Sequence, residues 1–191
     1  MIPLIFCSVL MIALIIERVW TYRKNVCDSS DLLEDVKQAY SPGQDPTKVN
    51  EILDAAGIPG KVFKRGIKNA GRGADSIEMA MEHEASALIP TLEANLPIIK
   101  TIVNIAPLLG LLGTIAGMIS SFRAASQAGL SNPTAILGGI SEALISTATG
   151  ISLAVIGFIF FNYFANVVQK TVSEIETYGA ELVNYLTDRV D

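Results

Sequence analysis

Two long segments without a charged residue, Thr101–Phe122 and Ala143–Gln169, constrain this chain of 191 residues more than any other feature. The hydrocarbon core of a membrane is about 30 Å thick, and roughly 20 helical residues cross it. Each segment is long enough to do so. Because only a short, mostly neutral stretch separates them, the two segments predict a helical hairpin that spans a membrane twice.

Small and hydroxyl-bearing residues form a stripe at helical spacing on each segment. Surfaces that face lipid favour large aliphatic side chains, whereas small residues let helix backbones approach closely. We therefore expect these two helices to pack against other helices in an assembly, around a polar axis. The residues expected in this packing are Gly110, Gly113, Gly117, Ser146 and Gly150.

Composition supports a membrane protein, because 50% of the residues are hydrophobic and only 17% are charged. The net charge of -5, with no basic patch with interleaved aromatic residues, argues against nucleic-acid binding. Cys7 and Cys27 are too few for a disulfide framework, so we expect two free thiols. His83 has no second His or Cys near it; we expect an exposed helical histidine, with no metal site and no cofactor.

A third apolar run, from Met1 to Ile16, is slightly short for a span at about 24 Å of helix. Extension through Trp20 makes it adequate. Its positive charges follow the run, whereas those of a signal peptide precede it. Most of the other cations lie between Asn25 and Asn95, and an excess of Lys and Arg marks the cytoplasmic side. The sequence thus predicts the N-terminus outside and the C-terminus inside.

The predicted fold is an all-α membrane protein with three transmembrane helices, of which the second and third extend into the cytoplasm as long helices. The predicted segments are 1–22, the first transmembrane helix; 23–96, a cytoplasmic helical insert; 97–124, the second transmembrane helix; 125–132, a short periplasmic turn; 133–168, the third transmembrane helix; and 169–191, a cytoplasmic helical tail.

Local signals place helix ends inside the insert. Ser30–Glu34 predicts a helix start, Ser41–Gly43 a stop, and Gly57–Gly60 a further break. Asp45–Pro46 and Asn132–Pro133 each predict a helix start, because an N-cap residue is followed by a proline at the first helical position. Two interpretations are open for the short basic helix Lys61–Asn69: its cations bind lipid headgroups or a regulator, or they only face solvent.

A capping box, Asp75–Glu78, predicts the start of a helix that runs to Phe122, on the order of 70 Å. Pro90, Pro97 and Pro107 are expected to bend this helix rather than to end it.

Glu142 is the one acid within the predicted hairpin. A charged side chain at the centre of a bilayer costs about 2.5–3.5 kcal/mol, so Glu142 should face protein or water. Two interpretations stay open: a carboxylate linked to protons or gating, and a structural carboxyl group that is hydrogen-bonded between subunits. A single acid makes a poor proton relay on its own.

Thr114 and Thr147 are predicted to lie at similar depths in the hairpin. If the chain folds back at the centre of the turn, two residues lie level when their numbers sum to about 257. The numbers of Thr114 and Thr147 sum to 261, so they lie within about one helical turn of level. Their hydroxyls either line a polar passage or bond the carbonyl of the preceding turn. Glu142 and Thr147 lie about 140° apart around the helix, so they cannot both face one axis. If Thr147 lines a lumen, Glu142 faces a neighbouring helix or subunit.

These residues carry a resemblance to a known family. The stretches IAPLLGLLGTIAGM (Ile105–Met118) and ISEALISTATG (Ile140–Gly150) are similar to the two signature helices of the MotA/TolQ/ExbB proton channel family, on its ExbB/TolQ side. The layout of spans resembles that family over nearly the whole chain. Val155–Gly157 replaces a proline that often follows the second motif in the family, and the three spans argue against the flagellar stator branch.

The resemblance implies a homopentamer in the bacterial inner membrane whose second and third spans line a central pore. A dimer of an ExbD/TolR-like single-span partner would occupy the pore and carry the protonatable aspartate. The resemblance assigns Thr114 and Thr147 to the pore lining, and Glu142 to the family's third-helix glutamate. The whole would energise a TonB- or TolA-like periplasmic protein for outer-membrane transport or envelope maintenance.

Two rival functions remain at this point. The first is a scaffold that assembles and stabilises a periplasmic partner without conducting ions. It would tolerate the loss of Glu142 and of both threonine hydroxyls. The second is an intramembrane enzyme, which the sequence disfavours because the spans contain no Ser/His pair, no Asp dyad and no set of metal ligands.

Overall fold

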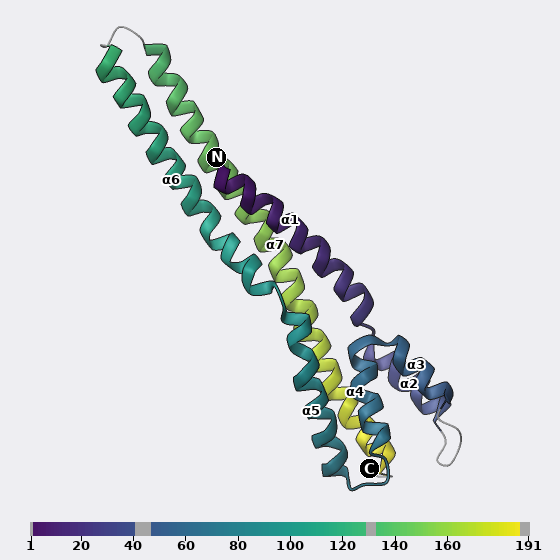
Figure 1. The fold of residues 1–191 in the computed structure, drawn as a ribbon. Helices are drawn as coiled ribbons and strands as arrows, with labels where there is room; N and C mark the ends of the chain where they lie inside the picture. Colours follow the sequence, from purple (N-terminus) through teal and green to yellow (C-terminus); the bar gives the residue numbers. More distant parts are fainter. Residues whose placement is uncertain (1, 41–46, 129–132, 188–191) are drawn as a thin grey trace. The chain divides into compact units, whose positions relative to one another are not determined.

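Seven α-helices make up the described part of the chain, residues 2–40, 47–128 and 133–187 of a computed structural model, and this part has no strand (Figure 1). The prediction of an all-α protein is thereby confirmed. The helices are α1 (Ile2–Asn25), α2 (Ser29–Ala39), α3 (Thr47–Ala55), α4 (Gly57–Lys68), α5 (Ala74–Glu93), α6 (Leu96–Ala128) and α7 (Pro133–Leu186).

Three helical stretches are long and apolar enough to cross a membrane, as the sequence predicted. They are Ile2–Ala39, Ala74–Ser126 and Leu137–Leu186, with mean hydropathies of 2.3, 2.0 and 2.1 in their most apolar windows. The two uncharged segments lie within α6 and α7, which count 33 and 54 residues. Both helices exceed the roughly 20 residues that a bilayer requires.

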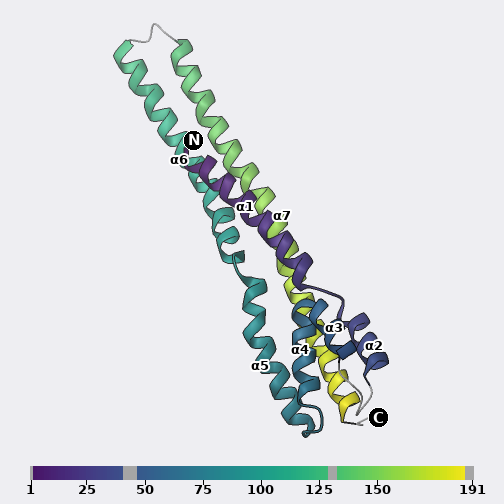
Figure 2. The ribbon, with the colours of Figure 1, turned by 45° about the vertical axis from the view of Figure 1, so that its right-hand side comes forward.

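The chain divides into two compact units. The first unit contains Met1–Glu17 and Asn95–Tyr163. Within it, α6 runs beside the first part of α7 (Figures 1 and 2). Leu4 of α1, Ala106 of α6 and Ala154 of α7 form a buried cluster, so each of the three helices contributes to the core of this unit.

The second unit contains Arg18–Ala94 and Phe164–Asp191. Within it, α4 packs against α3 and α5, and α3 packs against α2. Phe63 of α4 and Phe164 of α7 are fully buried, and the ring of Tyr22 lies 5.4 Å from that of Phe164. Lys37 of α2 donates to Glu181 of α7 at 2.5 Å. These contacts make the second unit a helical bundle with an apolar core.

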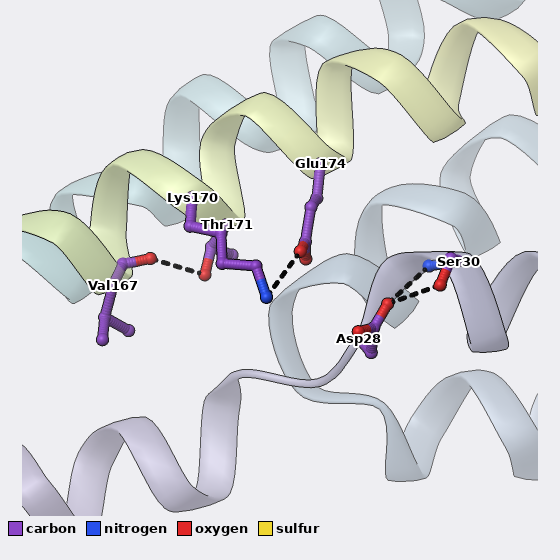
Figure 3. A network of polar contacts seen from close by, with 6 residues as sticks. All are labelled: Asp28, Ser30, Val167, Lys170, Thr171 and Glu174. Carbon is purple, nitrogen blue, oxygen red and sulfur yellow. Dashed lines mark hydrogen bonds and ion pairs between the residues drawn. The ribbon is translucent and has the colours of Figure 1, made fainter.

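Helix α2 begins two residues earlier than predicted, because its cap is Asp28. The carboxylate of Asp28 accepts hydrogen bonds from the hydroxyl of Ser30 at 2.7 Å and from its N–H at 3.0 Å (Figure 3). These bonds lower the pKa of Asp28 below its ordinary value. On α7, Lys170 lies 3.2 Å from Glu174, and the hydrogen bond between them is the main cause of the raised pKa of Lys170.

Cys27, between α1 and α2, is a free thiol whose Sγ donates to the carbonyl of Ala56 at 3.2 Å. Burial is the largest cause that raises the pKa of Cys27 from 9.0 to about 11, and the negative charges of Asp28 and Glu174 add to it. At pH 8 the thiolate fraction should therefore be about 100-fold below that of an ordinary thiol.

We expect iodoacetamide to alkylate Cys27 about 100-fold more slowly at pH 8 in the folded protein than in the denatured protein, since only the thiolate reacts. The rate should rise about tenfold per pH unit between pH 8 and 10, as deprotonation approaches the raised pKa. Mass spectrometry of a Cys7→Ser variant isolates this thiol. Equal rates in the folded and denatured protein would contradict the raised pKa.

The helix predicted to run unbroken from Asp75 to Phe122 is interrupted, so that prediction was wrong. Helix α5 ends at Glu93 and α6 begins at Leu96, with Asn95 in the left-handed region at φ 64°. Asparagine tolerates this conformation better than other non-glycine residues, and a helix often ends on such a residue. Pro90 and Pro107 do lie inside helices, as expected, whereas Pro97 lies in the first turn of α6, where proline is tolerated.

Two α1 side chains satisfy carbonyls that the end of α5 leaves without helical partners. Arg18, only 4% exposed, donates to the carbonyl oxygens of Thr91 at 3.1 Å and of Leu92 at 3.3 Å. The hydroxyl of Tyr22 also donates to Leu92, at 2.8 Å. The last carbonyls of a helix lack donors and carry partial negative charge, so a buried guanidinium is well placed there.

Other helix boundaries refine the predictions. The capping box at Asp75–Glu78 is not formed, because the cap of α5 is Gly73, without a side-chain hydrogen bond. The break at Gly57 is present at φ +64°, where an added Cβ would lie 2.6 Å from the carbonyl oxygen of Asn25. Gly60 instead lies inside α4. Helix α6 continues to Ala128. The predicted signals within 41–46 and 129–132 lie outside the described residues.

Candidate functional site

The α6–α7 hairpin brings the two backbones into close contact at Gly150, where an added Cβ does not fit, and at Gly110, where it fits only tightly. A Cβ added at Gly150 would lie 2.5 Å from the carbonyl oxygen of Ala106 and 3.1 Å from Cα of Gly110. A Cβ added at Gly110 would lie 3.1 Å from the carbonyl oxygen of Ser146. Small residues on facing helices permit this kind of backbone contact in membranes, so Gly110 and Gly150 set the spacing of the hairpin.

Gly113 and Gly117 extend this contact along α6. A Cβ at Gly113 would collide with the hydroxyl of Ser146, and one at Gly117 would lie 2.8 Å from Cβ of Ala143. Ser146 is only 4% exposed, and its Oγ has no hydrogen-bond partner among the described residues. All five residues predicted for helix packing thus lie where α6 and α7 of one chain meet.

Thr147 joins the two helices through a hydrogen bond. Its Oγ1 donates to the carbonyl oxygen of Gly110 at 3.1 Å, from one helix to the other. Thr114 lies one turn further along α6 and donates to the carbonyl of Leu111, in its own helix, at 2.6 Å. The two threonines therefore lie near one depth, but their hydroxyls bond differently. Both side chains are half-buried, which leaves part of each surface accessible.

Glu142 is exposed on the surface of α7 in this single chain. Ser146, one turn later, is buried against α6, whereas Thr149 is exposed and donates to the carbonyl of Ile145 at 2.8 Å. Glu142 consequently takes no part in the contact between α6 and α7. The described residues contain no group of three His, Cys, Asp or Glu side chains that could hold a metal ion.

Three contacts in the structure were not predicted from the sequence. A Cβ at Gly139 would collide with the hydroxyl of Ser121, and one at Gly157 would lie 2.7 Å from Sδ of Met11 and from Val103. The third is the contact of Arg18, one of the positive charges that follow the first apolar run, with the last carbonyls of α5. Glycines within apolar helices are the signal for the first two contacts. No sequence signal pairs Arg18 with residues more than 70 positions away.

Comparison with known proteins identifies the family of the chain. The sequence model of the MotA/TolQ/ExbB proton channel family matches residues 54–177, which include α4, α5, α6 and most of α7. The chain belongs to the MotA/TolQ/ExbB proton channel family. The resemblance predicted from the two hairpin motifs is thereby confirmed, and the three apolar helices are those of a membrane protein of this family.

Named relatives lie on the ExbB/TolQ side of the family. The biopolymer transport protein ExbB-like 3 of Synechocystis sp. is 31% identical over 178 residues, which cover 92% of this chain and 84% of the relative. The Tol-Pal system protein TolQ of Pseudomonas aeruginosa is 30% identical over 164 residues, or 84% and 70% of the two chains. The biopolymer transport protein ExbB of Xanthomonas campestris is 26% identical over 109 residues, or 57% and 43%.

Proposed function

We propose that the chain is the ExbB/TolQ-like subunit of a proton-motive-force-driven motor in the bacterial inner membrane. Five copies form a ring around a central pore, which holds a dimer of an ExbD/TolR-like single-span partner. The motor energises a TonB- or TolA-like periplasmic protein for outer-membrane transport or envelope maintenance. Membership of a proton channel family and relatives named ExbB and TolQ support this proposal.

The exposed position of Glu142 is the observation that carries the proposal. A carboxylate on the outside of an apolar hairpin would cost about 2.5–3.5 kcal/mol if it faced hydrocarbon. Since α6 of the same chain does not cover it, a second chain or water must. A ring of copies with a polar centre meets that requirement, and Thr114 and Thr147 offer hydroxyls near one depth for a proton path.

The orientation belongs to the same proposal. We infer a periplasmic N-terminus, a periplasmic turn at 125–132, and a cytoplasmic insert and tail at 23–96 and 169–191. The cations of the insert and those next to the first span support this direction. The spans at 1–22, 97–124 and 133–168 would then contact membrane lipids on their outer faces.

Proton flux into liposomes that contain the chain together with its ExbD/TolR-like partner tests the proposal. Thr114→Val plus Thr147→Val should lower the flux at least about tenfold, as loss of a path hydrogen bond worth roughly 1.4 kcal/mol predicts. Glu142→Gln should lower it as well. Thr149→Val is the matched control, because it removes an exposed hydroxyl from the same helix and should leave the flux unchanged.

Thr147→Ser separates a path from a packing role, since serine keeps the hydroxyl but loses a methyl group. A proton flux in the Thr147→Ser variant close to that of the parent chain supports a role of the hydroxyl in the path. If the flux survives Glu142→Gln and the double threonine change, these residues do not form the path. If an intact assembly of the parent chain and its partner carries no flux above that of empty liposomes, the alternative holds: a membrane scaffold that assembles and stabilises a periplasmic partner without conducting ions.

A further inference from the structure

A groove of about 370 Å³ lies in the second unit, between α5 and α7, with Val62 of α4 among its lining residues. Val62, Met81 and Ile175 are buried apolar residues of its lining. Two small residues, Ala85 and Gly179, keep the groove open where larger side chains would fill it. Neither the hairpin nor the proposed proton path uses this surface.

The spacing of the lining residues fits a helix. They recur every three or four positions from Glu78 to Ile89 on α5 and from Val172 to Val183 on α7. Two helices that carry such stripes side by side form a groove, and a third helix can pack there with its side chains between the two helices. At 1.5 Å per residue each stripe is about 16 Å long, which corresponds to three helical turns.

Unpaired carboxylates give the groove its charge. Glu78, Glu82 and Glu176 line it and are exposed, and none of them makes an ion pair or hydrogen bond with another described residue. Three nearby acids on the same two helices are paired: Glu84 with Arg65, Glu174 with Lys170 and Glu181 with Lys37. The stretch Ala74–Glu93 contains no Lys or Arg. Negative charge is thus left uncompensated at this groove.

A second copy of the chain offers little to fill the groove. Among the described residues of the second unit, the exposed large hydrophobic side chains are Trp20 and Met79 alone. The apolar residues of the basic helix α4, such as Phe63, are buried within their own chain. The described residues of the second unit therefore offer no exposed apolar stripe three turns long to the groove of another copy, and we take a different protein as the occupant.

We propose that the α5–α7 groove binds a short amphipathic helix of a second protein, with an apolar stripe at helical spacing flanked by Lys or Arg. The apolar stripe covers Met81 and Ile175, and the cations meet Glu78, Glu82 and Glu176. Helix-in-groove recognition of this kind reads anchors at every third or fourth position. Opposite charges at the rim select the partner and its orientation. The proposal does not depend on proton conduction.

Fluorescence anisotropy tests the proposal with the full chain in phosphatidylcholine nanodiscs. The probe is a labelled three-turn peptide with leucine at every third or fourth position and lysine on both flanks. We expect saturable binding at low salt, and no binding of the same peptide with glutamate in place of lysine. A peptide of the same composition with alternating leucines should also fail, because its apolar face is not helical.

Variants locate the site. Glu78→Gln, Glu82→Gln and Glu176→Gln together should weaken binding about tenfold, as the loss of three exposed charge pairs predicts. Ala180→Trp should block binding by filling the groove. The matched control changes three paired acids, Glu84→Gln, Glu174→Gln and Glu181→Gln, and should retain the affinity.

Three results would overturn the proposal. The first is equal binding of the lysine and glutamate peptides, or equal binding to empty nanodiscs. The second is equal weakening by the groove triple change and the control triple change. The third is a smaller assembly after Ala180→Trp, which would show that another copy of the chain occupies the groove.

Discussion

Gly150→Ala should destabilise the hairpin by about 3 kcal/mol or more, at the upper end of the range for overpacked sites. The added Cβ would meet the carbonyl oxygen of Ala106 at 2.5 Å and Cα of Gly110 at 3.1 Å, and both are backbone atoms. No side-chain rotation relieves such a contact, so the helices must separate. Thermal unfolding in detergent, followed by circular dichroism, measures the loss.

Gly138→Ala is the matched control on the same helix, because nothing lies within 4 Å of a Cβ at that position. Alanine favours a helix by up to about 1 kcal/mol over glycine, so this variant should be as stable as the parent or more so. Gly113→Ala adds a second check. It collides with Ser146, and Ser146→Gly in the same chain should restore stability. Equal stability of the Gly150 and Gly138 variants would refute the close approach.

Arg18→Met should cost about 1.5–3 kcal/mol, the range for hydrogen bonds made by a charged group. The change leaves the carbonyl of Thr91 without its donor at 3.1 Å, and it leaves the carbonyl of Leu92 with the Tyr22 hydroxyl alone. The end of α5 should then unfold locally. Hydrogen exchange with mass spectrometry should show faster exchange near residues 91–93, together with a lower unfolding midpoint.

Arg23→Met is the control, because Arg23 lies on the same helix but is exposed. Surface changes of this kind usually stay within about 0.5 kcal/mol. Arg18→Lys should fail to rescue, since an ammonium group lacks the fork of donors that reaches two carbonyls. If Arg18→Met behaves as Arg23→Met does, Arg18 does not hold the end of α5.

Much of this fold could be predicted because its main signal, the long uncharged stretches, lies within continuous segments of the sequence. The uncharged stretches of α6 and α7 predict spanning helices through length and hydropathy alone. A fold about the short turn predicts that Thr147 lies within about one helical turn of the depth of Thr114. Thr147 donates to Gly110, which lies one turn from Thr114 on α6. Stripes of small residues likewise indicate a close helix contact.

Other features depend on contacts far apart in sequence, and these could not be predicted. The end of α5 depends on Arg18 and Tyr22, which no spacing rule connects to Leu92. A local signal for the break itself was present, since Asn95 with Pro97 two residues later is typical of a helix end, but Pro97 was interpreted as a bend. The capping box at Asp75 failed because Gly73 already begins the helix. Glu142 could be identified from charge alone, whereas its exposed position on α7 is known only from the structure.

Backbone contact between α6 and α7 has a mechanical consequence. Two helices separated by side chains can slide or twist as those side chains change rotamer. At Gly110 and Gly150 no side chain lies between the backbones, and the hydrogen bond from Thr147 crosses the same level. Packed interfaces of this kind resist continuous deformation. The hairpin should therefore move as one rigid unit. In an assembly of such chains, motion would occur between hairpins rather than within one, and little strain would be stored inside each hairpin.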